Sequence, residues 1–283
     1  MKPKIISAVL DMMSKVKYVE SGNSHYYERI DTGKRLAGVT SVTNLLPKDW
    51  MPAWGAKEAV KFLGYFDKFK DEISNVEQQH LKEQLKSIKK MSPDEFFKHL
   101  HNAKSAFRRK SDKAKDIGQE GHDKLEEWVK AKIRNKPLPD LPDMCKPFIE
   151  WSDKNIKEFY LSEARVCDLV NDYAGTLDLL ALMTSGNIAI IDFKFADNIS
   201  DGWRPQTAAY LKTFIPYGID VKERYALRFP KSEYLKRWDK KSFSYTKIKN
   251  EFQSIEYNNY LDFDFETFLS LRQAFKWINF KGK

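Results

Sequence analysis

Tyr173 to Tyr210 reads YAGTLDLLALMTSGNIAIIDFKFADNISDGWRPQTAAY, and this stretch decides the fold that we predict. Two apolar runs, Ala174 to Met183 and Asn187 to Ala196, flank a short polar segment, Thr184 to Gly186. Apolar runs of strand length around a turn that contains glycine are typical of a β-hairpin. We therefore expect two neighbouring antiparallel strands here, with further elements packed around them.

Ionisable residues interrupt both apolar runs. Asp178 lies in the first run, and Asp192 and Lys194 lie in the second. Charges inside apolar strands are costly unless they are paired or bind a cation. The two-residue period of a strand places Asp192 and Lys194 on one face, about 7 Å apart. An odd number of loop residues puts Asp178 opposite Asp192, whereas an even number turns it to the other face unless a bulge corrects the register. We expect the odd loop or a bulge.

Two converging carboxylates beside a lysine are typical of a site for a hard cation. Oxygen ligands favour Mg²⁺ or Mn²⁺, and an incomplete protein shell leaves room for water and a phosphate group. Such a cation neutralises charge on a phosphodiester and lowers the pKa of water. The residues therefore predict metal-assisted hydrolysis.

The ordered set of motifs resembles the PD-(D/E)XK nuclease superfamily. The likeness is strongest to its RecB-like exonuclease branch, which includes the CRISPR-associated adaptation nucleases and the mitochondrial genome maintenance exonuclease. Matching elements run from about residue 38 to 229. They comprise a glycine and histidine pair, a Gly-Thr-x-Asp motif, an Asp-x-Lys motif and a Gln-x-x-x-Tyr motif: Gly118 with His122, Gly175 to Asp178, Asp192 to Lys194, and Gln206 with Tyr210.

The resemblance implies a role for each motif residue. The metal ligands would be His122, Asp178, Asp192 and the backbone carbonyl of Phe193, with Glu163 as an auxiliary ligand from the strand expected over 161–167. Lys194 would position the attacking water, Gln206 would support that water or Lys194, and Tyr210 would touch the DNA backbone.

Each of these residues also has a purely structural alternative. For His122 the alternative is a core histidine that bonds to a carbonyl, and for Glu163 it is a surface ion-pair partner. Gln206 and Tyr210, spaced i and i+4, fit a helix that packs on the sheet with its polar tips outward.

The sequence departs from some members of this branch. It has only two cysteines, Cys145 and Cys167, so we predict no iron–sulfur cluster. It also lacks a glycine-rich phosphate loop, so we expect no ATP-driven motor.

The overall charge suits a polyanionic partner. The chain carries 49 Lys and Arg against 40 Asp and Glu, a formal charge of +9. Part of this excess gathers before His122, and we predict that it forms a phosphate-backbone track: Lys104, Arg108, Arg109, Lys113 and Lys115. The alternative is an ordinary solvated helix face.

The chain is expected to be an α/β protein with a restriction-endonuclease-like core, in which helices flank a small mixed sheet, plus a helical N-terminal part. We divide it into a hairpin and helix segment (1–55), a helical basic part that carries His122 (56–140) and the nuclease core (141–283).

No apolar run approaches membrane-spanning length, so no membrane association is expected. Two unrelated cysteines and no signal peptide predict a reducing compartment: the cytoplasm of a bacterial or phage-infected cell, with the mitochondrial matrix as the alternative.

The residues predict metal-assisted hydrolysis, and the resemblance implies a divalent-metal-dependent DNA exonuclease that acts on single strands or DNA ends in recombination, repair or replication. A structure-specific or restriction-type endonuclease would use the same residues. The third alternative is a catalytically silent DNA-binding module. The residues leave open the digestion polarity, the choice between DNA and RNA, the oligomeric state, the pathway and any protein partner.

Overall fold

The computed structural model describes residues 1–22, 24–65, 75–239 and 244–279, and it divides into two compact units. The first unit comprises Met1–Leu46, Gly118–Glu233 and Asn250–Lys283, and the second comprises Pro47–Ile117 and Tyr234–Lys249. This division differs from the three predicted segments. The N-terminal residues belong to the same unit as the predicted core, and so does His122.

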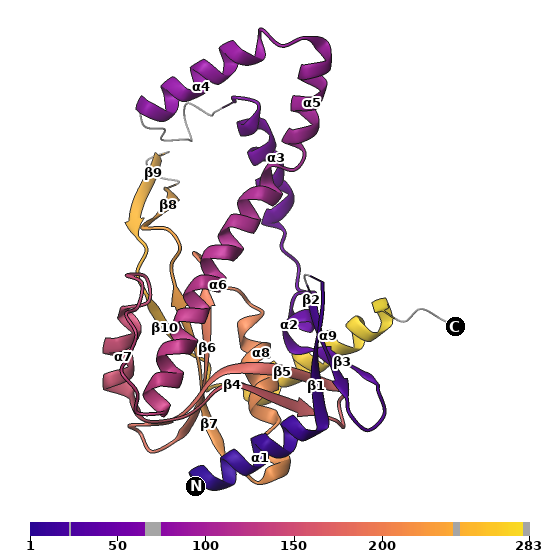
Figure 1. The fold of residues 1–283 in the computed structure, drawn as a ribbon, viewed down its shortest axis with the longest axis vertical. Helices are drawn as coiled ribbons and strands as arrows, with labels where there is room; N and C mark the ends of the chain where they lie inside the picture. The colour runs from indigo at the N-terminus through magenta and orange to yellow at the C-terminus, as the bar shows by residue number, and fades with distance from the viewer. Residues whose placement is uncertain (23, 66–74, 240–243, 280–283) are drawn as a thin grey trace. The chain divides into compact units, whose positions relative to one another are not determined.

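A mixed sheet forms the centre of the first unit (Figure 1). Its main path runs β1-β2-β3-β5-β6-β7-β10, and β4 pairs with β5 off this path. The strands are β1 (Val16–Ser21), β2 (Ser24–Arg29), β3 (Arg35–Gly38), β4 (Ile156–Asp168), β5 (Tyr173–Met183), β6 (Ile188–Phe195), β7 (Val221–Phe229) and β10 (Gln253–Glu256). The helices of this unit are α1 (Lys2–Lys15), α2 (Val39–Thr43), α7 (Pro147–Asn155), α8 (Trp203–Lys212), a 3₁₀ turn η1 (Ile215–Tyr217), α9 (Leu261–Asn279) and the larger part of α6 (Ala106–Ile133).

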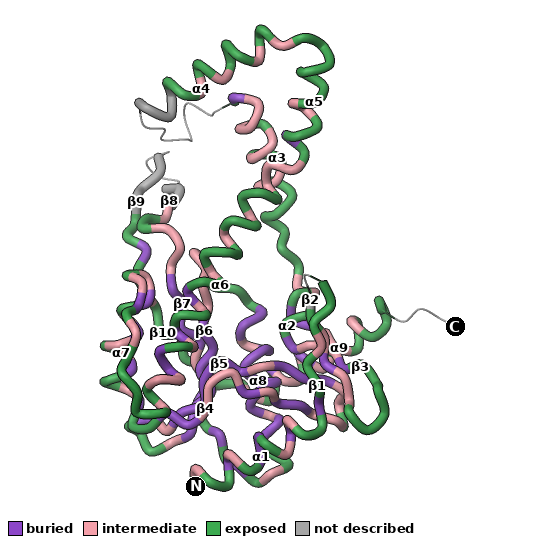
Figure 2. The backbone as a smooth tube through the Cα atoms, in the orientation of Figure 1, coloured by how far each residue is buried: buried purple, intermediate pink, exposed green. Residues whose placement is uncertain are grey.

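Helices cover the central strands on two faces, which explains their almost continuous apolar sequence. One core joins buried residues of α1, α8 and α9 to the sheet, and the other joins residues of α6 and α7 to it. Neighbouring residues of β6 divide between them: Ile190 lies in the first core and Ile191 in the second. Buried residues accordingly concentrate along β5, β6, β7 and α8 (Figure 2). The prediction of an α/β protein with a mixed sheet and flanking helices is confirmed.

The predicted hairpin is confirmed with its odd loop. Met183 donates its N–H to the carbonyl of Asn187 at 2.8 Å, and the N–H of Gly186 bonds back to the carbonyl of Met183 at 3.0 Å. Gly186 has a φ of 87°, the left-handed conformation that closes a three-residue hairpin loop. The register pairs Leu179 with Ile191, so Asp178 stands opposite Asp192.

Beyond that pair, β5 and β6 part, and we call this place the strand fork. Backbone pairing between them covers only 179–182 with 188–191, although both strands continue. On the same edge, Tyr173 and Ala174 pair with β3 instead, in parallel. Residues 175–178 of β5 therefore lie between the stretch that pairs with β3 and the stretch that pairs with β6, while β6 is paired in parallel with β7 from Ile188 to Phe195. The acids of the predicted site lie at this fork.

The N-terminal residues contribute to the main sheet rather than to a separate segment. A turn that contains Asp31 to Gly33 joins two strands, β2 and β3. Sequence periodicity could not show that β3 then pairs with β5, more than 130 positions further along the chain.

Two buried arginines stabilise the sheet edge away from the fork. Arg224 is 1% exposed and donates to Asp264 at 2.9 Å and to the carbonyls of Arg204 in α8 and of Asn259 before α9. Arg228 donates to the carbonyls of Ala196 and Asp197 and to Asn250. Because every one of these groups is paired, both arginines are structural residues.

The second unit combines helices with a hairpin. It contains α3 (Trp50–Phe62), α4 (Asn75–Ile88), α5 (Pro93–Ala103), the start of α6, and the hairpin of β8 (Tyr234–Asp239) and β9 (Ser244–Lys249). Ser92 and Glu95 form a capping box that starts α5. The second unit thus contains the predicted helical basic part only as far as Ile117, and it includes a hairpin distant in sequence. None of the described helices is long and apolar enough to cross a membrane.

Candidate active site

Asp178 and Asp192 are both buried at the strand fork. Their residues are 8% and 2% exposed. One oxygen of Asp178, Oδ2, accepts a hydrogen bond from the backbone N–H of Phe193 at 2.6 Å. The Asp178 carboxylate therefore accepts the hydrogen bond from the Phe193 N–H that a neighbouring strand would otherwise accept. In a strand the N–H and C=O of one residue point to the same edge, so the Phe193 carbonyl also faces the fork, as its predicted role requires.

His122 and Glu163 complete the acidic cluster. The His122 Nε2 atom lies 3.2 Å from Asp178 Oδ1, and its Nδ1 atom lies 3.8 Å from Glu163 Oε1. Ser162 pairs with Leu179 and Ala164 with Leu177, which places Glu163 opposite Asp178 on β4. One ligand atom each from His122, Glu163 and Asp178 lies within 4.8 Å of the others, a spacing that suits one metal ion.

Glu163, predicted as an auxiliary ligand, belongs to this group of three, whereas Asp192 does not. Its backbone φ of 52° is unusual for a residue with a side chain, and such strain gathers at functional sites.

The fork brings together side chains from both covering layers. His122 comes from α6, whose Leu125 and Trp128 belong to one core, and it contacts Asp178. Gln206 comes from α8 on the opposite face, and its Nε2 lies 3.4 Å from Asp192 Oδ1. Only where two strands separate can groups from both faces of a sheet meet in this way.

The charges of the cluster indicate room for a cation. Burial and the nearby Asp178 raise the pKa of Glu163 to about 8, and the same two causes raise the pKa of Asp192 to about 6. Burial opposes the charge on His122, but the neighbouring carboxylates outweigh it and raise its pKa to about 9. The Asp178 carboxyl keeps a lowered pKa despite its burial, because His122, Lys194 and the Phe193 N–H stabilise its charge. At neutral pH Glu163 and His122 therefore both hold protons, which offsets the negative charge of the cluster, and a divalent cation would supply that positive charge instead.

Lys194 links Asp192 to Gln206. Its Nζ lies 2.5 Å from Asp192 Oδ2 and donates to Gln206 Oε1 at 2.9 Å. Despite this ion pair, Asp192 Oδ2 is buried and accepts no well-directed hydrogen bond from any described residue. A buried carboxylate oxygen with free lone pairs fits a metal ligand. The predicted contact between Gln206 and Lys194 is confirmed.

Tyr210 does not occupy the predicted position at the DNA backbone. Its residue is 2% exposed, and its hydroxyl lies 3.4 Å from Gln206 Nε2. The ring lies over Gly175, where a Cβ would come within 2.6 Å of it. Gly175 of the Gly-Thr-x-Asp motif thus admits the Tyr210 ring, and Tyr210 positions Gln206.

Two contacts near the fork were not predicted from the sequence. The Thr40 hydroxyl lies 3.4 Å from Gln206 Nε2, and the Tyr27 hydroxyl lies 2.9 Å from the Thr176 hydroxyl. Both residues come from the N-terminal part that joins β5 through β3. The run Val39 to Thr43, which contains Thr40, fits the cap of a helix and gives no direct sign of this contact.

The glycines of α6 allow Phe195 to approach His122's helix. A Cβ on Gly121 would lie 2.3 Å from the Phe195 ring, which stacks on Phe229. At Gly118 the closest atom would be the flexible Lys231 Nζ at 3.0 Å. We expect Gly121→Ala to destabilise the protein by about 1–3 kcal/mol, as measured by chemical denaturation. Gly118→Ala is the matched control, and equal effects at the two positions would contradict this explanation.

The metal-free protein should lose stability as the pH rises. The pKa of Glu163 is about 8 in the fold and 4.5 for an ordinary exposed glutamate, as in the unfolded chain. Its protonation therefore stabilises the fold fully below pH 4.5, and this contribution is lost as the pH rises through 8. We therefore expect the Tm of Glu163→Gln, relative to wild type in chelator, to be higher at pH 8 than at pH 5. Glu158→Gln, an exposed change on the same strand, is the control. A Tm difference that does not vary with pH would contradict the raised pKa.

The basic residues of the predicted track are all exposed and lie in the second unit. Arg108 and Lys115, seven positions apart on α6, share one face of the helix, whereas Arg109 and Lys113 lie on another. Arg109 also stacks on Phe62, with 4.9 Å between the guanidinium carbon and the ring centroid. These residues form two basic faces rather than one stripe.

Comparisons with known proteins assign no family to the chain. No family model matches it, and no curated protein matches it. Among solved structures, one titled "Crystal structure of SSO0001" is similar to 99% of this chain over 86% of its own length, at 11% sequence identity and a TM-score of 0.35.

Proposed function

We propose that this protein is a divalent-metal-dependent deoxyribonuclease, and specifically an exonuclease that acts on single-stranded DNA or DNA ends. The observation that carries the proposal is the strand fork, where two buried carboxylates, a histidine, a glutamate and a lysine converge. At a structural ion-pair cluster elsewhere in the chain, the single acid Asp264 is paired with two cations, Arg204 and Arg224. The fork instead has more acids than bases, as a cation site does.

The proposed metal ligands are Asp178, Asp192, Glu163, His122 and the Phe193 carbonyl. Oxygen donors in the majority favour Mg²⁺ or Mn²⁺, and the single imidazole is compatible with Mn²⁺. When bound, such an ion would offset the negative charge of a phosphodiester and promote ionisation of water.

The chain's own residues would orient the reactants. Lys194, held between Asp192 and Gln206, places its ammonium group where an attacking water or a phosphate oxygen could receive a hydrogen bond. Gln206 is itself fixed by Thr40 and Tyr210, so Lys194 has little freedom to move. In the hydrolysis, the water oxygen forms a bond to phosphorus, the bond from phosphorus to the departing strand breaks, and the departing oxygen takes up a proton.

A digestion series tests this proposal. Linear single-stranded and double-stranded DNA, each labelled at the 5′ or the 3′ end, and circular single-stranded DNA are incubated with Mg²⁺, Mn²⁺ or chelator. We expect metal-dependent loss of linear DNA and survival of the circle. Cutting of the circle would favour an endonuclease built from the same residues. If no DNA is cut with either metal, a DNA-binding module without catalysis replaces the proposal.

A further inference from the structure

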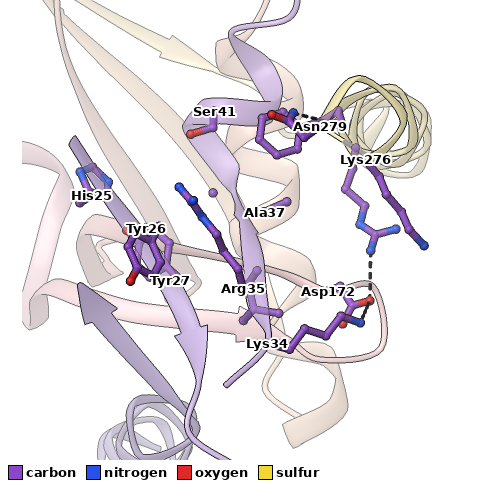
Figure 3. Close-up of a pocket in the computed structure, with 14 residues that line it drawn as sticks. His25, Tyr26, Tyr27, Lys34, Arg35, Ala37, Ser41, Asp172, Lys276 and Asn279 are labelled. Carbon is purple, nitrogen blue, oxygen red and sulfur yellow. Dashed lines mark hydrogen bonds and ion pairs between the residues drawn. The ribbon is translucent and has the colours of Figure 1, made fainter. Parts of the chain in front are cut away.

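A basic hollow of about 550 Å³ lies outside the acidic cluster, between β2, β3 and α9 of the first unit. Figure 3 shows Tyr26, Arg35 and Ser41 on one side of it and Lys276 and Asn279 on the other. Its ionisable lining beyond His25 comprises four cations and one acid: Lys34, Arg35, Arg272, Lys276 and Asp172. We call it the β3–α9 hollow.

The single acid of the hollow is already shared by two cations. Asp172 lies 2.7 Å from Lys34 Nζ and 3.2 Å from a guanidinium nitrogen of Arg272. Arg35 and Lys276 make no ion pair with any residue that the structure describes. The Nε atom of Arg272 is buried and likewise has no hydrogen-bond partner there. The hollow therefore carries uncompensated positive charge and a free donor, which suits an anion.

Arg35 is held in place for such a contact. Its guanidinium carbon lies 4.3 Å from the centroid of the Tyr26 ring, a cation–π arrangement. Stacking on an aromatic face leaves the edge donors of a guanidinium free for phosphate oxygens. Tyr26 and Phe275 also add aromatic surface to the lining. Cations interleaved with aromatic rings are typical of surfaces that bind a nucleic-acid strand.

The wall of the hollow continues into the strand fork. Tyr27 lines the hollow, and its hydroxyl contacts Thr176, which precedes Asp178 by two residues, about 7 Å along β5. On the other side, Ser41 lines the hollow while the adjacent Thr40 contacts Gln206. A strand with one phosphate at the acids would need to extend only a short way to place another phosphate in the hollow.

We propose that the β3–α9 hollow binds the phosphate backbone of the DNA strand whose scissile phosphate lies at the strand fork. This inference rests on the proposed nuclease function and adds to it a second contact region on the substrate. The ligand class is a phosphodiester strand, recognised through charge and without regard to base sequence.

Charge removal in the hollow tests the inference. The double variant Arg35→Gln, Lys276→Gln is compared with wild type for binding a fluorescent single-stranded oligonucleotide in chelator, over a salt series. Each phosphate contact to single-stranded DNA contributes about 0.7 to the slope of log affinity against log salt, so we expect a slope flatter by about 1.4 and affinity weakened roughly 10- to 25-fold at 0.1 M salt. The matched control Lys222→Gln removes an exposed lysine of the same unit that does not line the hollow.

The reciprocal change should have the opposite effect. Asp172→Asn keeps the size of the side chain and tolerates the φ of 53°, because asparagine adopts left-handed conformations readily. It would release Lys34 and Arg272 toward a phosphate, so we expect tighter binding by roughly fivefold and a steeper salt slope. The double variant binding with wild-type affinity and slope would overturn the inference, and so would unchanged or weaker binding by a folded Asp172→Asn protein.

These outcomes are separate from those of the proposed function, because binding is measured without metal. If the wild-type protein cuts no DNA but the hollow variants still change binding as expected, the proposed nuclease function is rejected and the binding role of the hollow is supported. If the wild-type protein cuts DNA with metal but the hollow variants bind DNA normally, the binding role of the hollow is rejected and the nuclease function is supported.

Discussion

Asp192→Asn is expected to lower the rate of metal-dependent DNA cleavage by at least about 10³-fold, because charge stabilisation by a bound metal is worth several kcal/mol and each tenfold in rate is about 1.4 kcal/mol. Asparagine has the size of aspartate but offers a metal no negative charge. The measurement is the initial rate of release of labelled nucleotide from linear single-stranded DNA with Mn²⁺. The Mn²⁺ bound per chain, counted by electron paramagnetic resonance, should fall in parallel.

The same variant should remain folded and bind DNA. Asp192 is 2% exposed, and its burial raises the pKa of the carboxyl. A neutral amide at this position removes the free-energy cost of a buried charge in the metal-free fold. We expect an unchanged or higher Tm and oligonucleotide affinity within a few-fold of wild type. Asp220→Asn, an exposed change in the same unit, controls for the loss of one negative charge. Cleavage by Asp192→Asn at more than about a tenth of the wild-type rate would remove this residue from the metal site.

Local sequence rules were sufficient for the hairpin. The three residues Thr184 to Gly186 determine which positions of β5 and β6 face each other, and a glycine at the last of them allows the left-handed turn. The convergence of Asp178 and Asp192 follows from that register. The contact of Lys194 with Gln206 was likewise predicted, because it joins the hairpin to the next helix along the chain.

Long-range packing determined what the sequence could not show. Tyr210 has the spacing of a surface residue of α8, but its burial depends on Gly175 in another element. Glu163 becomes a central member of the cluster through the pairing of β4 with β5. Thr40 reaches Gln206 only because β3 adds to the sheet in parallel. No periodicity within one segment reports a partner more than a hundred residues away.

The boundary between the two units illustrates the same limit. Helix α6 is continuous, and its charge pattern gives no sign of a division at Ile117. Two glycines, Gly118 and Gly121, follow this boundary. They mark where the helix begins to pack closely against the core, because the Phe195 ring lies against Gly121. The group that approaches the helix at Gly121 is thus a core aromatic ring.

Lys194→Met should also abolish cleavage, by roughly 10²–10⁴-fold, the range for loss of a group that moves or positions a proton. Methionine keeps the length of the side chain and removes the ammonium, so Gln206 loses the donor it now accepts from at 2.9 Å. Unlike Asp192→Asn, this change should leave Mn²⁺ binding intact or make it tighter, because it removes a positive charge beside the ligands. Mn²⁺ titration therefore distinguishes the two roles.

The stability of the Lys194→Met variant provides a second test of the same ion pair. Lys194 opposes the rise in the pKa of Asp192, so without it this pKa should rise further above its present value of about 6. The metal-free variant should then be less stable than wild type by about 3 kcal/mol at pH 8 and by less at pH 5, where the buried carboxyl takes up a proton. Adding Asp192→Asn removes the unpaired charge, so the double variant should regain stability at pH 8 without regaining activity. A double variant as unstable as Lys194→Met would mean that Lys194 stabilises the fold by packing, whereas restored cleavage would exclude it from the chemistry.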